Sequence, residues 1–163
     1  MKNWKIPPPI KVYEALGAIG DGRVRTIDND DAAGAWDVVS SEGAKTYRVE
    51  LSADGREISS NDNASYWQGY LGYPAIAVLL ARGTLHASAK ATRALAGIPW
   101  KELNRRFKND YARTTAEVAR IVEERGGDFE AIRAEAIAIL DALAALALER
   151  GARRRPPREG PAS

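Results

Sequence analysis

The chain has 163 residues, of which 45% are hydrophobic and 28% are charged, values that are ordinary for a globular protein with one core. It contains no cysteine and a single histidine, His86, which excludes disulfides, thiolate metal sites and cysteine nucleophiles and leaves little scope for histidine cages. No apolar stretch reaches the roughly 20 residues of a bilayer span, and no signal segment is recognisable, so we expect a cytoplasmic protein without metal or cofactor.

The small net charge of +2 hides an alternation of acidic and basic blocks. Residues 1–81 carry 8 basic and 11 acidic side chains, a net charge of −3, and residues 82–113 carry 8 basic and 2 acidic ones, a net charge of +6. Residues 114–149 carry 3 basic and 8 acidic side chains (−5), and residues 150–163 hold 5 arginines and one glutamate (+4). Such blocks can bind phosphate groups or neutralise each other inside one fold, and the sequence leaves both interpretations open.

The first half of the chain is typical of a short helix followed by an antiparallel sheet. After the proline run 7–9, apolar residues recur every three positions from Ile10 to Ile19, which predicts a helix that ends at residues 20–22. Strand-like segments separated by turn residues then follow, at residues 23–28, 35–40, 47–51 and 56–59. We therefore expect a meander of three or four antiparallel strands.

Residues 59–74 are the least ordinary stretch, since they hold four of the twelve aromatic residues of the chain. The rings can lock the sheet onto the next segment, residues 75–81, which is apolar on all sides and so predicts a buried helix. Alternatively, the segment is exposed and its amides and rings contact bases or peptides. The candidate binding residues of this second interpretation are Asn61, Asn63, Tyr66, Trp67 and Gln68.

The second half of the chain is predicted to be helical. After a looser polar segment at 83–97, a long helix opens at residues 98–100 and ends at the glycine pair 126–127. Asp128 is a good N-cap for another long helix with an apolar face from Phe129 to Leu146, so we expect an antiparallel hairpin. Residues 151–163, rich in Arg, Pro and Gly, are predicted to be disordered.

These elements predict an α+β protein: a short N-terminal helix, a three- to four-stranded antiparallel meander, a buried helix and a C-terminal antiparallel helical hairpin. The boundaries place a sheet domain at 1–97, a helical hairpin packed on it at 98–150, and the basic tail at 151–163.

No arrangement of residues predicts a catalytic or metal site. The acidic run at 28–31 lacks the spacing of a calcium-binding loop and is typical of a turn between strands. His86, near Lys90, is typical of a surface histidine, and no glycine-rich phosphate loop precedes a helix. Asp62 is the only candidate general base of the aromatic segment, so an enzyme would need a defined pocket around it.

The basic block includes a set of cations on the predicted long helix. Lys101, Arg105 and Lys108 are spaced four and three residues apart and so share one helix face, with Arg106 beside them. Such a face can follow a phosphate backbone, or it can be a solvated face that pairs with Asp110 and with acidic residues of the next helix.

The segment from the third strand to the buried helix, about residues 45–82, resembles a SWIM zinc-finger module. In that family, CxC follows a strand and CxH begins an apolar helix, and Ser59, Asn61, Tyr73 and Ala75 stand at these positions here. The resemblance implies a metal-free relative in which aromatic packing replaces zinc, because none of these four residues is a zinc ligand. The chain also resembles uncharacterised archaeal proteins, and its single methionine and abundant Arg, Glu and Ala are typical of a thermostable protein.

The sequence favours a non-enzymatic protein that binds DNA or RNA through the basic helix face and tail. A first alternative is a protein-interaction module that self-associates through the last helix. A second is a small-molecule-binding protein or enzyme with a pocket at residues 61–73. A choice among these three hypotheses requires knowledge of the fold.

Overall fold

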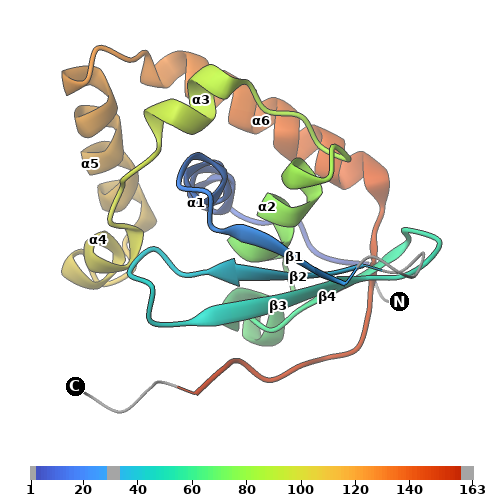
Figure 1. Ribbon diagram of the computed structural model, residues 1–163. Coiled ribbons are helices and arrows are strands. Elements are labelled where there is room, and N and C mark those ends of the chain that lie inside the picture. The colour runs from blue at the N-terminus through green and yellow to red at the C-terminus, as the bar shows by residue number, and fades with distance from the viewer. Residues whose placement is uncertain (1–2, 29–33, 159–163) are drawn as a thin grey trace.

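A computed structural model describes residues 3–28 and 34–158 and confirms the mixed α+β fold (Figure 1). The first half follows the predicted order closely, because its elements are local and clearly punctuated by proline and glycine. The elements are α1 (Pro9–Gly20), β1 (Val24–Asp28), β2 (Gly34–Val39), β3 (Thr46–Leu51) and β4 (Glu57–Ser60). Residues 29–31 of the acidic run lie outside the described residues.

The four strands form an antiparallel meander with one buried and one solvated face. Trp36, Val38 and Val49 face the core, as the alternation along β2 and β3 requires. On the other face, Asp37 lies in register between Arg25 and Arg48, and its carboxylate accepts a 3.2 Å hydrogen bond from Arg48 Nε. Opposite charges across neighbouring strands stabilise this solvated face modestly.

The helices lie in layers over the buried face of the sheet (Figure 1). A short π-helix, η1 (Ala64–Gln68), follows β4 and leads to α2 (Tyr73–Ala81), whose residues from Pro74 to Leu79 are all buried. Helix α2 packs on β1 to β4, and α1 packs against α2. The predicted buried helix is thus confirmed, and the sheet, α1 and α2 form the centre of the fold.

The second half contains α3 (Ala89–Ala94), α4 (Trp100–Arg106), α5 (Tyr111–Glu124) and α6 (Phe129–Leu146). The single long helix predicted from residue 98 to the glycine pair at 126–127 is wrong, because the chain breaks between α4 and α5. Lys108 and Asn109 adopt left-handed backbone angles, with φ of 53° and 61°, which an α-helix does not accommodate. Asp110 then begins α5 as an N-cap, accepting a hydrogen bond from the Arg113 N–H.

A fifth strand that the sequence did not predict completes the sheet. After α6, β5 (Glu149–Arg150) pairs in parallel with β4, so the described sheet has the order β1-β2-β3-β4-β5. The next residues, predicted to be disordered, run extended along the molecule as far as residue 158: Gly151 N–H donates to Ile58 O at 2.9 Å, and Arg154 pairs with Glu50 at 2.8 Å. Disorder of the tail stays a prediction, and residues 159–163 lie outside the described residues.

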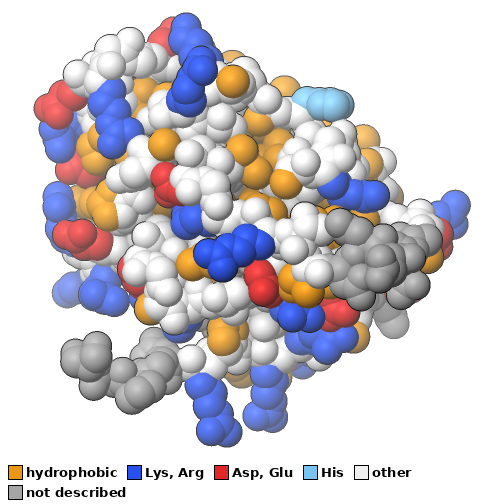
Figure 2. Space-filling view, viewed as in Figure 1, with side chains coloured by type: hydrophobic (Ala, Val, Ile, Leu, Met, Phe, Trp, Pro, Cys, Tyr) orange, Lys and Arg blue, Asp and Glu red, His pale blue; other side chains and the backbone are white. Residues whose placement is uncertain are grey.

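Figure 2 shows basic side chains along the lower edge of this face and a mixture of basic and acidic side chains over α4 and α5. Three ion pairs each join a residue of a basic block to a residue of an acidic block: Lys101 with Glu42, Arg106 with Glu117, and Arg154 with Glu50. Within the described residues, no helix is long and apolar enough to cross a membrane.

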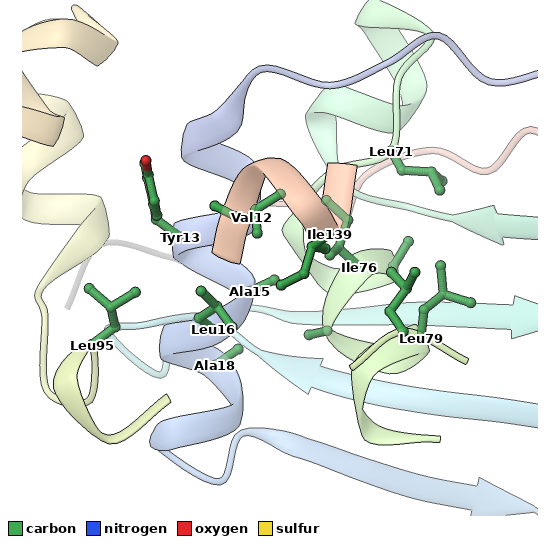
Figure 3. Close-up of a cluster of buried hydrophobic side chains, with 14 of the residues drawn as sticks. Val12, Tyr13, Ala15, Leu16, Ala18, Leu71, Ile76, Leu79, Leu95 and Ile139 are labelled. Atoms are coloured by element: carbon green, nitrogen blue, oxygen red, sulfur yellow. The ribbon is translucent and has the colours of Figure 1, made fainter. Parts of the chain in front are cut away.

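One continuous core joins the predicted segments 1–97 and 98–150. Figure 3 shows α1 at its centre, with Leu16 of α1, Ile76 of α2 and Ile139 of α6 pointing toward one another. The Tyr13 and Phe129 rings lie 5.1 Å apart, which ties α1 to the first turn of α6. The helical hairpin is therefore part of the same core as the sheet.

Candidate functional site

A half-open pocket of about 540 Å³ lies beside the N-terminal half of α1, where the charged residues of that helix stand. Its inner side is formed by Lys11 and Glu14 of α1 and by the side chains of Tyr47 and Tyr73. One wall comes from η1 and the residues that flank it, and the opposite wall comes from α4 and the start of α5. Elements far apart in the sequence thus converge on one site, at the aromatic segment where the sequence placed a candidate pocket.

A buried ion pair lies on the inner side of this pocket. Lys11 Nζ lies 3.2 Å from Glu14 Oε1, and the two side chains are 12% and 6% exposed. Burial raises the pKa of the Glu14 carboxyl, and the Lys11 ammonium opposes that change. Burial alone would lower the pKa of Lys11, but the Glu14 carboxylate and Tyr111 outweigh it, so the pKa is raised and the ammonium stays charged. The pair places an ammonium group and a carboxyl group side by side in the lining of the pocket.

Tyrosine side chains surround this ion pair. Tyr47 and Tyr73 meet edge to face with their ring centroids 6.2 Å apart, and the Arg23 guanidinium lies over the Tyr73 ring at 5.7 Å. Burial, together with Asp62 and Glu42, raises the pKa of Tyr47 to about 12, and burial also raises the pKa of Tyr73. Both hydroxyls are therefore neutral at physiological pH, when they can donate and accept hydrogen bonds.

Asp62 lines the pocket, but its carboxylate is occupied by hydrogen bonds that build the site. It accepts from Ser60 Oγ at 2.5 Å, from Ser65 Oγ at 2.7 Å and from Ser65 N–H at 3.1 Å. Ser65 Oγ in turn accepts from Gly72 N–H, and any Cβ at position 72 would overlap the Asp62 carboxylate. Asp62 therefore fixes the start of η1 to the start of α2, an arrangement that assigns it a structural role.

The π-helix η1 places Trp67 at the rim of the pocket. The Trp67 side chain is 67% exposed, and its ring meets the Tyr66 ring edge to face at 4.6 Å. Gly69 ends η1 with a left-handed φ of 76°, which turns the chain back toward α2. Asn63 and Gln68 lie on the same rim, exposed and without a hydrogen-bond partner among the described residues.

The opposite wall contains buried polar atoms without partners. Trp100, Lys101 and Asn104 come from α4, and Asn109 comes from the break after it. Trp100 Nε1 and Asn104 Oδ1 are buried and make no hydrogen bond within the described residues. Gly17 permits this position of Trp100, because a Cβ there would lie 2.7 Å from Nε1. Buried polar atoms are normally satisfied, so these two atoms are exceptions, and Trp100 Nε1 lies against Gly17 of α1, which does not line the pocket.

The structure brings together part of the predicted binding residues and separates the rest. Lys101, Asn63, Trp67 and Gln68 line the same pocket, although they come from α4 and from the region of η1. Asn61 lies elsewhere, because its Oδ1 accepts from Arg48 N–H at 2.7 Å and holds β3 to β4.

Tyr66 lies behind Trp67, and one of its faces is covered by the Arg153 guanidinium at 4.2 Å. It therefore borders a second, shallow hollow lined by Lys5, Arg150 and Arg153, which Trp67 separates from the pocket.

The predicted basic helix face is not a continuous surface. Lys101 pairs with Glu42 at 3.0 Å, and Arg106 pairs with Glu117 of α5 at 3.3 Å. Lys108 lies beyond the end of α4, so it does not share a helix face with Lys101 and Arg105. Arg105 and Lys108 are exposed and have no ion-pair partner among the described residues.

Sequence reasoning missed the residues on the inner side of the pocket. Lys11 and Glu14 lie between the positions of the apolar stripe from Ile10 to Ile19, so the periodicity does not single them out. A signal was present: Val12 and Ala15 make the helix apolar on its other faces too, so any charged residue in its middle must be buried. The residues of α4 gave no such signal, because their position depends on the break at Lys108.

Comparison with family models gives a match that covers most of the chain. A family model matches residues 4–149. The chain belongs to the family described as "Uncharacterised conserved protein UCP014422". The matched range contains every residue that lines the pocket. No curated protein and no solved structure matches the chain.

This family assignment carries no activity, and it does not bear on the resemblance to SWIM modules, which stays a prediction. Within the described residues, no group of three or more His, Cys, Asp or Glu side chains is arranged to hold a metal ion.

Proposed function

We propose that this protein binds a small polar molecule with a planar ring in the pocket between η1 and α4. The observation that carries the proposal is the convergence on one pocket of the exposed Trp67 ring and the side-chain amides of Asn63 and Gln68, which have no hydrogen-bond partner among the described residues. A ligand that stacks on the ring and pairs with the amides gains affinity from both contacts.

The size and the lining of the pocket support the same proposal. A volume of about 540 Å³ lies within the range of roughly 300–1,000 Å³ that small-molecule sites occupy. Aromatic side chains supply apolar contact area, and amide and hydroxyl groups are placed around them, the combination that fixes the orientation of a bound ring. Lys11 and Glu14 of the lining pair with each other, and Arg23 and Lys101 pair with Asp21 and Glu42 outside it, which favours a ligand whose bound part is polar but neutral.

A thermal-shift panel with nucleotides, sugars, amino acids and organic acids tests this proposal. At least one class should raise the melting temperature of the natural protein in a concentration-dependent manner, because ligands stabilise the folded state that binds them. In the variant Ala64→Trp, a bulky side chain enters the pocket lining and should abolish the increase. Ala138→Trp places the same side chain on the exposed surface of α6 and is the matched control.

The proposal fails if no class of the panel stabilises the protein. It also fails if the stabilisation is the same in Ala64→Trp and in Ala138→Trp, because the ligand then binds elsewhere.

Nucleic-acid binding is the second candidate function. The observation that favours it is the basic hollow beyond Trp67, formed by Lys5, Arg150 and Arg153, together with the unpaired Arg105 and Lys108 beside the opposite wall. Cations on both sides of an exposed aromatic ring are typical of sites that hold single-stranded nucleic acid. This function and the first share the pocket, and they differ in whether the ligand extends beyond it.

A further inference from the structure

We infer that the planar ring recognised by this pocket is a nucleobase, held between Trp67 and the side-chain amides of the two walls. This inference rests on the proposed function and names the class of ligand that the same site takes. It applies to a base of a free nucleotide and to a base of a single strand, because both present the same ring and the same polar edge.

The side-chain amides that line the pocket are the first reason to expect a nucleobase. Asn63 and Gln68 lie on the η1 wall, and Asn104 and Asn109 lie on the α4 wall. None of these side-chain amides has a hydrogen-bond partner among the described residues. Each amide presents one acceptor and one donor group side by side, the arrangement that pairs with the adjacent donor and acceptor atoms of a base edge. The two walls together can therefore contact a base from two of its edges.

The carboxylates that line the pocket already have partners, which argues against a sugar as the ligand. Sugar hydroxyls are hydrogen-bond donors that need free acceptors, and carboxylates are the strongest acceptors in a protein. Here the Asp62 carboxylate is occupied by Ser60 and Ser65, and the Glu14 carboxylate is paired with Lys11. Recognition therefore falls to neutral amides, hydroxyls and rings, which suit a heteroaromatic ring better than a set of hydroxyl groups.

Trp67 supplies the stacking surface. It is the most exposed of the large hydrophobic side chains that the structure describes, at 67%, and it stands at the rim between the pocket and the basic hollow. The Tyr66 ring supports it edge to face, and the Arg153 guanidinium lies on Tyr66 at 4.2 Å, so the platform is held from behind. Stacking of one base on an aromatic side chain contributes about 1–3 kcal/mol, that is, about 5- to 150-fold in affinity.

Cations at the mouth of the pocket fit the phosphate that a nucleotide carries. Lys101 lines the pocket and is paired only with Glu42, and both side chains are about one-third exposed. An exposed ion pair of this kind contributes little free energy, so Lys101 can exchange Glu42 for a phosphate group. Further cations lie on the other side of Trp67, where Lys5, Arg150 and Arg153 can bind a phosphate group that extends in that direction.

The test is a titration followed by tryptophan fluorescence, with the four nucleoside 5′-monophosphates, adenosine, ribose 5-phosphate and glucose as probes. At least one nucleotide should quench the fluorescence with saturation, and ribose 5-phosphate and glucose should not compete with it. Trp67→Ala should weaken binding by about tenfold, in line with the loss of one stacking contact, and Gln68→Ala should also weaken it. Lys90→Ala, a substitution of an exposed cation on α3 away from the pocket, should leave the affinity unchanged. Binding to Trp67→Ala is followed by calorimetry, since that variant lacks the reporting ring.

A decauridylate probe separates the two sources of the base. Binding at least about tenfold tighter than that of the monophosphate, with a steeper salt dependence, supports a base supplied by a single strand; equal affinity supports a free nucleotide. The inference is overturned if ribose 5-phosphate displaces the nucleotide, or if Trp67→Ala binds it as tightly as the natural protein. It is also overturned if only sugars, amino acids or organic acids bind in the pocket, a result that leaves the proposed function standing.

Discussion

At the scale of single residues, the ion pair of Lys11 and Glu14 is the least ordinary feature of the core. The helix around it is buried from Val12 to Ala18, so two charges lie where apolar side chains are expected. Taking two charges out of water costs several kcal/mol, and their attraction offsets that cost only when both partners are present. The pair is therefore retained at a cost to stability, which is consistent with a role in the pocket that it lines.

A double-mutant cycle on this pair measures that cost. Lys11→Met and Glu14→Leu, made singly, should each lower the free energy of unfolding by about 3 kcal/mol, because each leaves one buried charge without its partner. The double variant should come within about 1 kcal/mol of the natural protein, since two apolar side chains of similar volume replace the pair. Urea denaturation monitors all four proteins. Additive losses in the double variant would contradict a direct coupling between the two side chains.

The residues of the site were only partly predictable from sequence. Asn63, Trp67 and Gln68 were found because they stand in one short stretch of unusual composition, where local sequence suffices. Asn104 and Asn109 were not found, because they reach the pocket only through the break between α4 and α5. Asp62 was found, but its hydrogen bonds to Ser60 and Ser65 depend on how η1 folds back, which residue type does not reveal.

At the scale of secondary-structure elements, the break between α4 and α5 sets the shape of the site. Lys108 and Asn109 take left-handed backbone angles, and Asp110 then starts α5 in a new direction. The hydrophobic pattern runs through this point without interruption, so periodicity predicted one long helix. The fifth strand was missed for a related reason. It has two residues and no hydrophobic pattern of its own, and it forms because the end of α6 places the chain beside β4.

Substitution of Lys108 tests the break directly. A non-glycine residue in the left-handed region is strained by about 1–2 kcal/mol, and glycine removes most of that strain at some cost in chain entropy. Lys108→Gly should therefore raise the free energy of unfolding slightly, by about 0.5 kcal/mol. Arg105→Gly, inside α4, should lower it by about 1 kcal/mol, as glycine does in a helix interior. Equal losses in both variants, measured by urea denaturation, would indicate a continuous helix through residue 108.

At the scale of the whole molecule, the alternating charge blocks partly neutralise each other within the fold, which is one of the two roles that the sequence left open. The pairs of Lys101 with Glu42, Arg106 with Glu117 and Arg154 with Glu50 each join a basic block to an acidic one, so part of the segregated charge is neutralised within the fold. Self-association through α6 stays a prediction that light scattering tests. The inner face of α6 is used by the core, and its outer face retains Ile137, which is 51% exposed.

Reversing the charge of the cations that have no ion-pair partner tests whether the protein binds a nucleic-acid strand and not only a single nucleotide. Arg105 and Lys108 have no ion-pair partner among the described residues, whereas Arg106 is held by Glu117. If a strand passes over this side of the pocket, Arg105→Glu and Lys108→Glu should weaken binding of a fluorescent decauridylate more than Arg82→Glu, an exposed charge reversal at the end of α2.

Each lost phosphate contact should also reduce the slope of log affinity against log salt by about 0.7 for a single strand. Fluorescence anisotropy at low and at physiological salt measures both quantities. An affinity that responds neither to salt nor to these reversals would confine the ligand to the pocket. The remaining cations would then serve the fold and its solubility, because an interaction with phosphate backbones cannot be insensitive to both.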